Sequence, residues 1–263
     1  MRYFAAPGAT HKTDNSIVTE ADVAIESYLR STLGGNDVAI LGEEEPAADH
    51  AALADQIQHG TAWVLDPIDG TAPYANQLPN WGISIGYLEN GRFSRGAIFL
   101  PRTGEVVITE GDGVLYQRMS RDPASWRMDD LTPLEPRDAT YSTAGMITVP
   151  QSIHSRSIFT GNNPVQAIGS AVYAATKLLL GQYICYVAKI RLWDIAAAIA
   201  LLRAAGHTIV FADGTPLDDR VVAEQWVLDG DASSLWYARG QLFMAHDPAT
   251  LEHVRAHYRY ERK

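Results

Sequence analysis

The sequence has little cysteine and few basic residues. Cys185 is the only cysteine among 263 residues, so neither an intrachain disulfide nor a cysteine-rich zinc site can form. Lysine and arginine total 21 against 31 aspartate and glutamate residues, which gives a formal net charge of −10. A chain this acidic repels a phosphate backbone, so we do not expect it to bind nucleic acid through a general basic surface.

The sequence also lacks a long hydrophobic run. The longest apolar stretch lies near residues 195–202, well short of the ~20 residues that cross a bilayer. Residues 1–10 do not combine a charged start with an apolar run, so we expect no signal peptide and no membrane contact. Together with the single cysteine, these absences suit a cytoplasmic protein.

What is present is an ordinary globular composition, 46% hydrophobic and 20% charged. The apolar patterns predict helices at residues 19–34, 51–59, 171–181, 193–205 and 251–258. They predict strands at residues 38–41, 61–65, 81–88, 93–100, 105–109, 146–149, 183–187, 209–211 and 226–228. The first-half strands form an antiparallel meander, which indicates an α+β fold. The polar segment 118–137 favours a boundary between a subdomain at 1–138 and another at 139–263.

Two of the apolar strands end in acidic residues. The strand at 38–41 runs into Glu43, and the strand at 61–65 runs into Asp66 and Asp69. A carboxylate at the buried end of a strand is costly unless a positive group compensates it, and few basic residues are nearby in the sequence. Carboxylates, carbonyls and water are the ligands that Mg²⁺ prefers. The pattern therefore indicates a site for hard cations.

The segment between Asp66 and Thr71 has features of a phosphate site. Pro67 fixes φ where the chain leaves the strand, and Gly70 lets the backbone approach a ligand closely. Thr71 begins a helical turn whose free N–H groups can receive a phosphate. The alternative is a capped turn in which Asp69 only satisfies backbone donors. Asp22 and Asp194, each near a predicted helix start, have the same simple explanation.

These motifs occur together and in order, and that combination is specific. They are WVLDPIDGT at residues 63–71, GEE at 42–44, GSA at 169–171, WDIAA at 193–197, and Lys12 followed by VTEAD at 18–22. From about residue 12 to residue 214 the chain resembles the inositol monophosphatase family of metal-dependent, lithium-sensitive phosphatases. The resemblance implies a layered α-β-α-β-α sugar-phosphatase-like fold, hydrolysis of small phosphate monoesters, two to three Mg²⁺ ions and a homodimer.

The resemblance also implies a role for each metal ligand. Glu43, Asp66 and the carbonyl of Ile68 are expected to hold the first Mg²⁺. Asp66, Asp69 and Asp194 are expected to hold the second. Glu43 also contacts a third, weaker ion.

Further roles follow from the same resemblance. Thr71, paired with Asp22, is expected to help deprotonate the attacking water, so that Thr71, Asp22 and Glu43 form the catalytic set. The backbone N–H groups of Gly70 and Thr71 are expected to hold the phosphate, and the GSA motif is expected to line the alcohol side. The full set of expected substrate contacts is Asp69, Gly70, Thr71, Gly169, Ser170, Ala171 and Val187. Lys12 belongs to a mobile loop near the metals.

The substrate stays open at this stage. Val187 falls where inositol monophosphatases present a glutamate to the inositol hydroxyls, so we expect no strong preference for inositol 1-phosphate. Inositol phosphates, sugar phosphates such as fructose bisphosphate, histidinol phosphate and phosphoadenosine phosphate all remain candidates. A regulatory binding protein that retains the fold and a metal-binding structural module are the alternatives from other classes. Both are weakened because no metal ligand is lost and the pair Thr71 and Asp22 is retained.

Overall fold

The computed structural model describes residues 8, 10–11, 17–35, 38–45, 49–120, 122–135, 140–151 and 157–260. Its largest sheet has seven strands in chain order: β3 (Val38–Gly42), β4 (Thr61–Asp69), β5 (Gly82–Glu89), β6 (Arg92–Leu100), β7 (Glu105–Glu110), β8 (Gly113–Arg118) and β9 (Thr132–Pro133). Only β3 and β4 are parallel, because α3 (His50–His59) connects them; the other pairs are antiparallel. The expected meander is confirmed.

A second sheet lies in the C-terminal half. Its five strands are ordered β12 (Val165–Ala167), β10 (Ile147–Val149), β13 (Cys185–Ala188), β15 (Leu242–Ala245) and β14 (Thr208–Phe211). The first three are parallel, and β15 lies antiparallel between β13 and β14. The strand predicted at residues 226–228 is wrong: Trp226 forms only an isolated bridge with Ala238.

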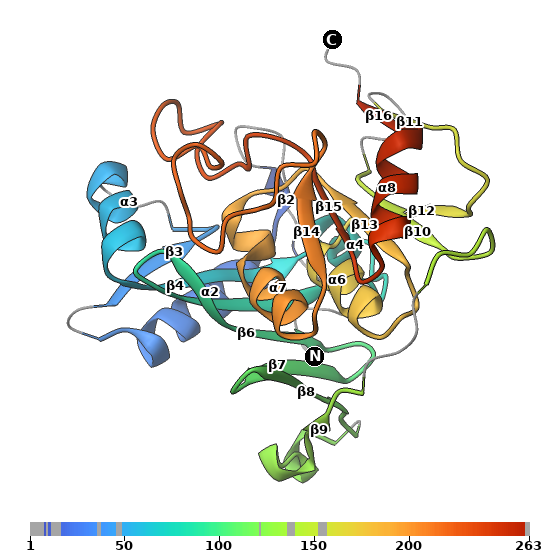
Figure 1. The fold of residues 1–263 in the computed structure, drawn as a ribbon. Coiled ribbons are helices and arrows are strands. Elements are labelled where there is room, and N and C mark those ends of the chain that lie inside the picture. The colour runs from blue at the N-terminus through green and yellow to red at the C-terminus, as the bar shows by residue number, and fades with distance from the viewer. Residues whose placement is uncertain are drawn as a thin grey trace.

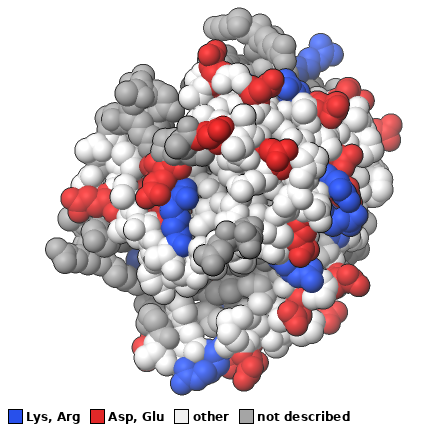
Figure 2. Space-filling model, turned by 90° about the vertical axis from the view of Figure 1, so that its left-hand side faces the viewer, with Lys and Arg blue, Asp and Glu red and all other residues white. Residues whose placement is uncertain are grey.

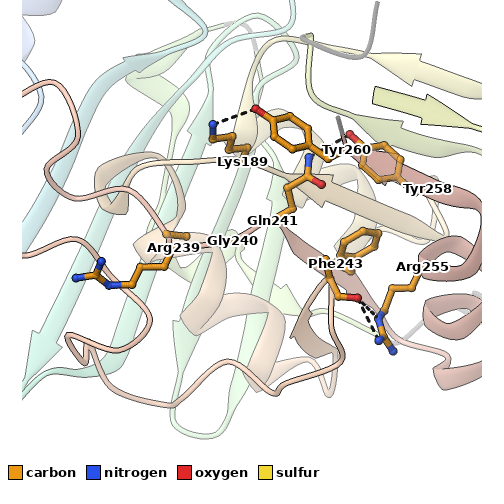
Figure 3. Close-up of a pocket in the computed structure, with 10 residues that line it drawn as sticks. Lys189, Arg239, Gly240, Gln241, Phe243, Arg255, Tyr258 and Tyr260 are labelled. Carbon is orange, nitrogen blue, oxygen red and sulfur yellow. Dashed lines mark hydrogen bonds between the residues drawn. The ribbon is translucent and has the colours of Figure 1, made fainter. Parts of the chain in front are cut away.

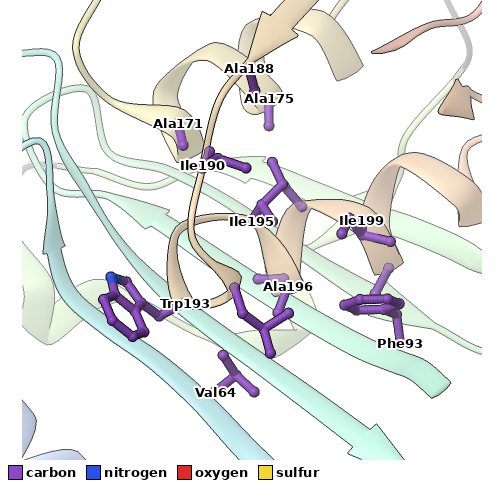
Figure 4. Packing of buried hydrophobic residues seen from close by; sticks show 14 of the residues in the cluster. Val64, Phe93, Ala171, Ala175, Ala188, Ile190, Trp193, Ile195, Ala196 and Ile199 are labelled. Atoms are coloured by element: carbon purple, nitrogen blue, oxygen red, sulfur yellow. The ribbon is translucent and has the colours of Figure 1, made fainter. Parts of the chain in front are cut away.

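Helices separate and cover the two sheets. α2 (Glu20–Leu33) packs against β4, and α8 (Pro248–His257) packs against β15 and β13. Between the sheets lie α6 (Ala171–Leu179) and α7 (Leu192–Ala204), as Figure 1 shows. The predicted layered α-β-α-β-α arrangement is therefore confirmed. Helix α7 is apolar on all sides because it is enclosed on all sides, and Figure 4 shows Ile195, Ala196 and Ile199 among the packed side chains.

Two glycines let α7 lie close to the large sheet. Gly86 and Gly96 face each other on β5 and β6. A Cβ on Gly96 would lie 2.2 Å from the carbonyl oxygen of Ala197, and one on Gly86 would lie 2.9 Å from the Cβ of Ala196. The hydroxyl of Ser84 also donates to the carbonyl of Trp193 at 3.2 Å. These contacts fix the start of α7, where Asp194 lies, against the sheet.

The remaining elements are short. β1 (Thr10–His11) pairs with β2 (Ile17–Val18), and β11 (Ser157–Phe159) pairs with β16 (Tyr258–Tyr260). The expected surface segment contains two 3₁₀ turns, Pro123–Ser125 and Met128–Asp130. No helix in the described ranges is long and apolar enough to cross a bilayer. On the face in Figure 2, acidic side chains are spread over the surface with basic ones among them.

In the sequence, the strands of the two large sheets fall on either side of residue 138. The seven-stranded sheet ends at Pro133, and the five-stranded sheet begins at Ile147. One hydrophobic cluster nevertheless includes residues from both sheets and from the helices between them, such as Val64, Ala175 and Leu242. The division into two subdomains stays a prediction.

Candidate functional site

Three carboxylates from distant parts of the chain meet at one point. Glu43 follows the end of β3, Asp66 lies in β4, and Asp194 lies in the first turn of α7. One ligand oxygen from each side chain lies within 4.8 Å of the others, a separation that suits a shared metal ion. Asp66 is 1% exposed, whereas Glu43 and Asp194 are half-buried. The structure thus brings together three of the four predicted metal-binding carboxylates.

The end of β4 is shaped by an irregularity in its pairing with β5, located between Asp66 and Asp69. The N–H of Ile68 donates to Asp66 Oδ1 at 3.0 Å, which holds this carboxylate beside its own strand. Gly70 then adopts φ 92°, and a Cβ there would lie 2.9 Å from the Cβ of Ser170. Only glycine fits this position. The predicted helical turn follows as α4 (Thr71–Ala75).

Thr71 and Asp22 are neighbours, as the sequence predicted. The hydroxyl of Thr71 lies 3.5 Å from Asp22 Oδ1 and 3.2 Å from the carbonyl oxygen of Ile68. Asp22 is fully buried in the first turn of α2. The N–H of Thr19 donates to its other oxygen at 2.8 Å. Because Thr19 occupies one side of the carboxylate, the other side remains directed at Thr71.

Asp69 lies beside the cluster and binds the start of α6. Its Oδ2 accepts hydrogen bonds from the hydroxyl of Ser170 and, at 2.8 Å, from the N–H of Val172. Ser170 Oγ in turn accepts from the N–H of Tyr173 at 3.2 Å, as an N-cap. Ser170 therefore supports Asp69 and the helix, which agrees with its expected place next to the substrate rather than as a nucleophile.

The carboxylates oppose one another electrostatically. Burial, followed by the charges of Glu43, Asp69 and Asp194, holds the pKa of Asp66 well above its usual range. Burial and the charges of Glu43 and Asp69 do the same for the pKa of Asp194. Burial raises the pKa of Asp69 to about 6, against the opposing effect of its hydrogen bonds from α6.

Within the part of the chain that the structure describes, no lysine or arginine forms an ion pair with Asp66 or Asp194, although the charge of Arg191 acts to lower the pKa of Asp194. Buried carboxylates in this number need a positive partner. The donor set consists of carboxylate and carbonyl oxygens, which is the set that divalent hard cations prefer. The residues present therefore fit a metal cofactor.

A cavity of about 280 Å³ opens beside these carboxylates. Asp69 and Asp194 line it, and the expected Gly169, Ser170 and Ala171 line it from the start of α6. The sequence interpretation missed further lining residues, which are Thr148, Val149, Pro150, Gln151, Tyr186, Ala188, Lys189 and Ile190. They come from the ends of β10 and β13, and strand alternation along β13 was the one signal that could have indicated them.

Val187 lies outside this cavity, contrary to its expected place. Its side chain is fully buried in a separate cluster with Phe243 and Val254, on the face of β13 that α8 covers. Side chains alternate along a strand, so Tyr186 and Ala188 face the cavity instead. Lys12, the expected loop residue, lies outside the described residues.

Comparisons with known proteins identify the family of the chain. The model of the inositol monophosphatase family matches residues 3–239. The inositol-1-monophosphatase ImpA of Mycolicibacterium smegmatis is 30% identical over 226 residues, 80% of this chain and 75% of that protein. A fructose-1,6-bisphosphatase/inositol-1-monophosphatase of Thermotoga maritima is 28% identical over 154 residues, 58% of this chain and 57% of that protein.

A solved structure shows the same fold. It is an IMPase/NADP phosphatase complexed with Mg²⁺ and phosphate, with a TM-score of 0.70 and 15% identity. The match covers 95% of this chain and 86% of that chain.

Proposed function

The chain belongs to the inositol monophosphatase family and is a phosphoric monoester hydrolase, and we propose that it hydrolyses small polyol or sugar phosphates with Mg²⁺ held by its acidic cluster. The observation that carries the proposal is the meeting of Glu43, Asp66 and Asp194 within 4.8 Å at the edge of a cavity. We propose two to three ions, with Asp69 and the carbonyl of Ile68 completing the ligand set.

Bound Mg²⁺ would neutralise the phosphate charge and lower the pKa of a water molecule. The chain's own residues supply the rest. The Thr71 hydroxyl donates a hydrogen bond to Asp22 Oδ1 at 3.5 Å, so Thr71 Oγ1 would accept a proton from the attacking water as its own proton passes to Asp22. The backbone N–H groups of Gly70 and Thr71 would hold the phosphate oxygens, because Gly70 lets the chain approach them closely.

The cavity supports a hydroxyl-bearing leaving group. Thr148, Gln151 and Tyr186 supply hydroxyl and amide groups to the lining of the cavity. Position 187 is a valine buried in the cluster with Phe243 and Val254, so no carboxylate at that position hydrogen-bonds to the hydroxyls of inositol. A site that hydrogen-bonds a substrate hydroxyl can lower kcat/KM for an analogue without that hydroxyl by ~10⁴-fold, whereas an apolar contact typically discriminates by only ~10–200-fold. We therefore propose broad specificity, below about a thousandfold preference for inositol 1-phosphate.

The test is phosphate release from a panel of monoesters with Mg²⁺ and with excess EDTA. The panel contains inositol 1-phosphate, glucose 1-phosphate, glycerol 2-phosphate, fructose 1,6-bisphosphate, histidinol phosphate and adenosine monophosphate. We expect release from several members with Mg²⁺ and none with EDTA. Full activity in EDTA would rule the metal requirement out.

The variant Asp66→Asn tests whether the acidic cluster holds the metal. Asp66→Asn keeps the shape of the side chain and removes the charge at the centre of the cluster, so we expect kcat/KM to fall by at least ~10³-fold, the worth of several kcal/mol of charge stabilisation. Asp112→Asn, at an exposed aspartate between β7 and β8 with no part in the proposed reaction, is the matched control and should retain activity. Near-native turnover by Asp66→Asn would contradict the assignment.

We further propose that the protein is a cytoplasmic homodimer, as the family resemblance suggests. Light scattering at micromolar concentration tests the assembly directly, and a monomer there would refute it.

A further inference from the structure

A second cavity of about 500 Å³ lies next to the catalytic one. It is formed by the end of β13, the chain leading into β15, and the last elements α8 and β16, as Figure 3 shows. Its lining residues are Lys189, Ala212, Ala238, Arg239, Gly240, Gln241, Phe243, Arg255, Tyr258 and Tyr260. None of them has a place in the reaction proposed above.

The charge of this cavity is opposite to that of the whole chain. All three ionisable residues of fixed charge that line it are basic, whereas the net charge of the protein is −10. Two of them have acidic neighbours: Arg239 lies 3.9 Å from Asp229, and Arg255 lies near Asp213. Lys189 is exposed and, among the described residues, forms no ion pair. Its ammonium group is therefore available to an anion.

Polar side chains lie beside Lys189 in the second cavity. Lys189 Nζ donates to the hydroxyl of Tyr260 at 3.1 Å. Gln241 Nε2 donates to the hydroxyl of Tyr258 at 3.2 Å, and that hydroxyl donates to Ser157 Oγ at 2.8 Å. Figure 3 shows Lys189, Gln241, Tyr258 and Tyr260 at one end of the cavity, with Arg239 directed away from them. An ammonium, hydroxyl and amide together suit an oxyanion.

Lys189 belongs to both cavities. It follows the last residue of β13, the strand whose Tyr186 and Ala188 face the catalytic cavity and whose Val187 packs with Phe243 on the other face. A ligand that extends from the carboxylates past the end of β13 therefore meets Lys189 first. The acidic residues of the catalytic cavity, Asp69 and Asp194, would need bound Mg²⁺ to hold the phosphoryl group, whereas the second cavity offers a distal anion the basic side chains of the chain itself.

From this arrangement we propose that the second cavity binds a distal anionic group on the alcohol part of the substrate, and that Lys189 selects substrates carrying one. The anion is a second phosphate or a carboxylate. The proposal rests on the phosphatase activity proposed above and narrows its substrate class. The phosphoryl group that is cleaved stays at the acidic cluster, and the distal group lies between Lys189, Gln241 and Tyr260.

The experiment compares kcat/KM within matched substrate pairs. Fructose 1,6-bisphosphate is paired with fructose 1-phosphate and fructose 6-phosphate, and 2-phosphoglycerate is paired with glycerol 2-phosphate. We expect the wild type to prefer the member with the extra anion by ~10-fold or more, the usual worth of a hydrogen bond to a charged group. The pair with the larger preference identifies whether phosphate or carboxylate is the favoured anion.

Two variants test the residues. Lys189→Met keeps the aliphatic stem and should lower the preference ratio by ~10-fold. Tyr260→Phe, which alters only the second cavity, should lower the ratio in the same direction. Arg95→Met removes an exposed positive charge elsewhere, on β6, and should leave the ratio unchanged. It controls for the effect of net charge on the binding of anionic substrates.

The outcomes separate the two proposals. No phosphate release from any substrate would refute the phosphatase activity itself. Release with no preference in the wild type, or a ratio unchanged by Lys189→Met, would overturn the anion site alone. A ratio lowered by Lys189→Met and unaffected by Tyr260→Phe would place the anion in the catalytic cavity and overturn the second one.

Discussion

Thr71 and Asp22 form the pair that we propose activates the attacking water. Asp22 is fully buried and is held on one side by the N–H of Thr19. Its other oxygen faces the Thr71 hydroxyl at 3.5 Å. Neither residue belongs to the carboxylate group that meets within 4.8 Å. A change at Thr71 should therefore separate chemistry from metal binding.

Thr71→Ala should lower kcat by roughly 10²–10⁴-fold, the usual contribution of a positioned proton acceptor. Metal affinity, measured by calorimetry beside the kinetics, should change little because the acidic cluster is intact. Thr71→Ser keeps the hydroxyl and is the matched control, with kcat close to that of the wild type. Unchanged kcat in metal-loaded Thr71→Ala, together with a collapse of metal affinity, would show that Thr71 supports the metals instead.

Sequence reasoning at this scale identified residues better than orientations. Each carboxylate alone also fitted a capped turn or helix start, and only the occurrence of all the motifs in order indicated a shared metal site. The side chains facing the cavity were not predictable. Val187 was expected there, but the alternation of β13 turns Tyr186 and Ala188 inward. Gln151 reaches the site from another strand, and no local pattern records that tertiary contact.

At the scale of elements, helix α6 is attached to the large sheet at both ends. Asp69 of β4 accepts hydrogen bonds from its first turn. Near its last turn, Lys177 Nζ forms an ion pair with Glu105 of β7 at 2.6 Å, and both side chains are buried. Despite burial, hydrogen bonding by Lys177 lowers the pKa of Glu105. The pair sets the position of α6, and through it the positions of Ser170 and the cavity wall.

Removing one member of this pair should leave the other as a costly buried charge, so the effects of the two changes should not add. Lys177→Met leaves Glu105 buried and unpaired, which typically costs ~3–5 kcal/mol of unfolding free energy. Glu105→Gln should cost a comparable amount because it leaves Lys177 unpaired. The double variant should cost at least ~1 kcal/mol less than the sum of the single variants. Urea unfolding of the four proteins measures the difference; additive losses would show that the two residues do not interact.

The predicted elements were most accurate where the pattern was long. The helices predicted at 19–34 and 193–205 correspond to α2 and α7, and the meander was found strand by strand up to β7. β15 was missed because its four residues are all apolar and show no alternation. The strand predicted at 226–228 is likewise a short run of apolar residues only. Only pairing with β13 and β14 decides which short apolar run becomes a strand.

At the scale of the whole molecule, the acidic cluster joins the two halves of the chain. Glu43 and Asp66 come from the seven-stranded sheet, and Asp194 comes from the helix between the sheets. Folding brings these charges together at an electrostatic cost, which the raised pKa values of Asp66, Asp69 and Asp194 record. A bound cation removes that cost. Metal binding should therefore stabilise the entire fold rather than the site alone.

The pH dependence of this stabilisation has a definite sign. Without metal, the folded protein binds more protons than the unfolded chain wherever a carboxyl pKa is raised, so these groups favour folding at low pH. For Asp69 that contribution is lost as the pH rises from about 3.8 to about 6. Mg²⁺ binds the deprotonated carboxylates and displaces their protons. Its stabilising effect must therefore increase with pH.

Thermal unfolding with Mg²⁺ and with EDTA, at pH 5 and at pH 8 and at matched ionic strength, tests this expectation. At one fixed concentration, 100 times the Kd measured at pH 8, Mg²⁺ should stabilise the fold at pH 8 by ~2.7 kcal/mol, which raises Tm by roughly 5–10 °C in a chain of this size. The Mg²⁺-dependent rise should be clearly larger at pH 8 than at pH 5. Asp66→Asn, which removes the central charge, should abolish most of the rise at both values. An equal rise at the two pH values, or one that Asp66→Asn does not reduce, would show that Mg²⁺ stabilises the protein somewhere other than at this cluster.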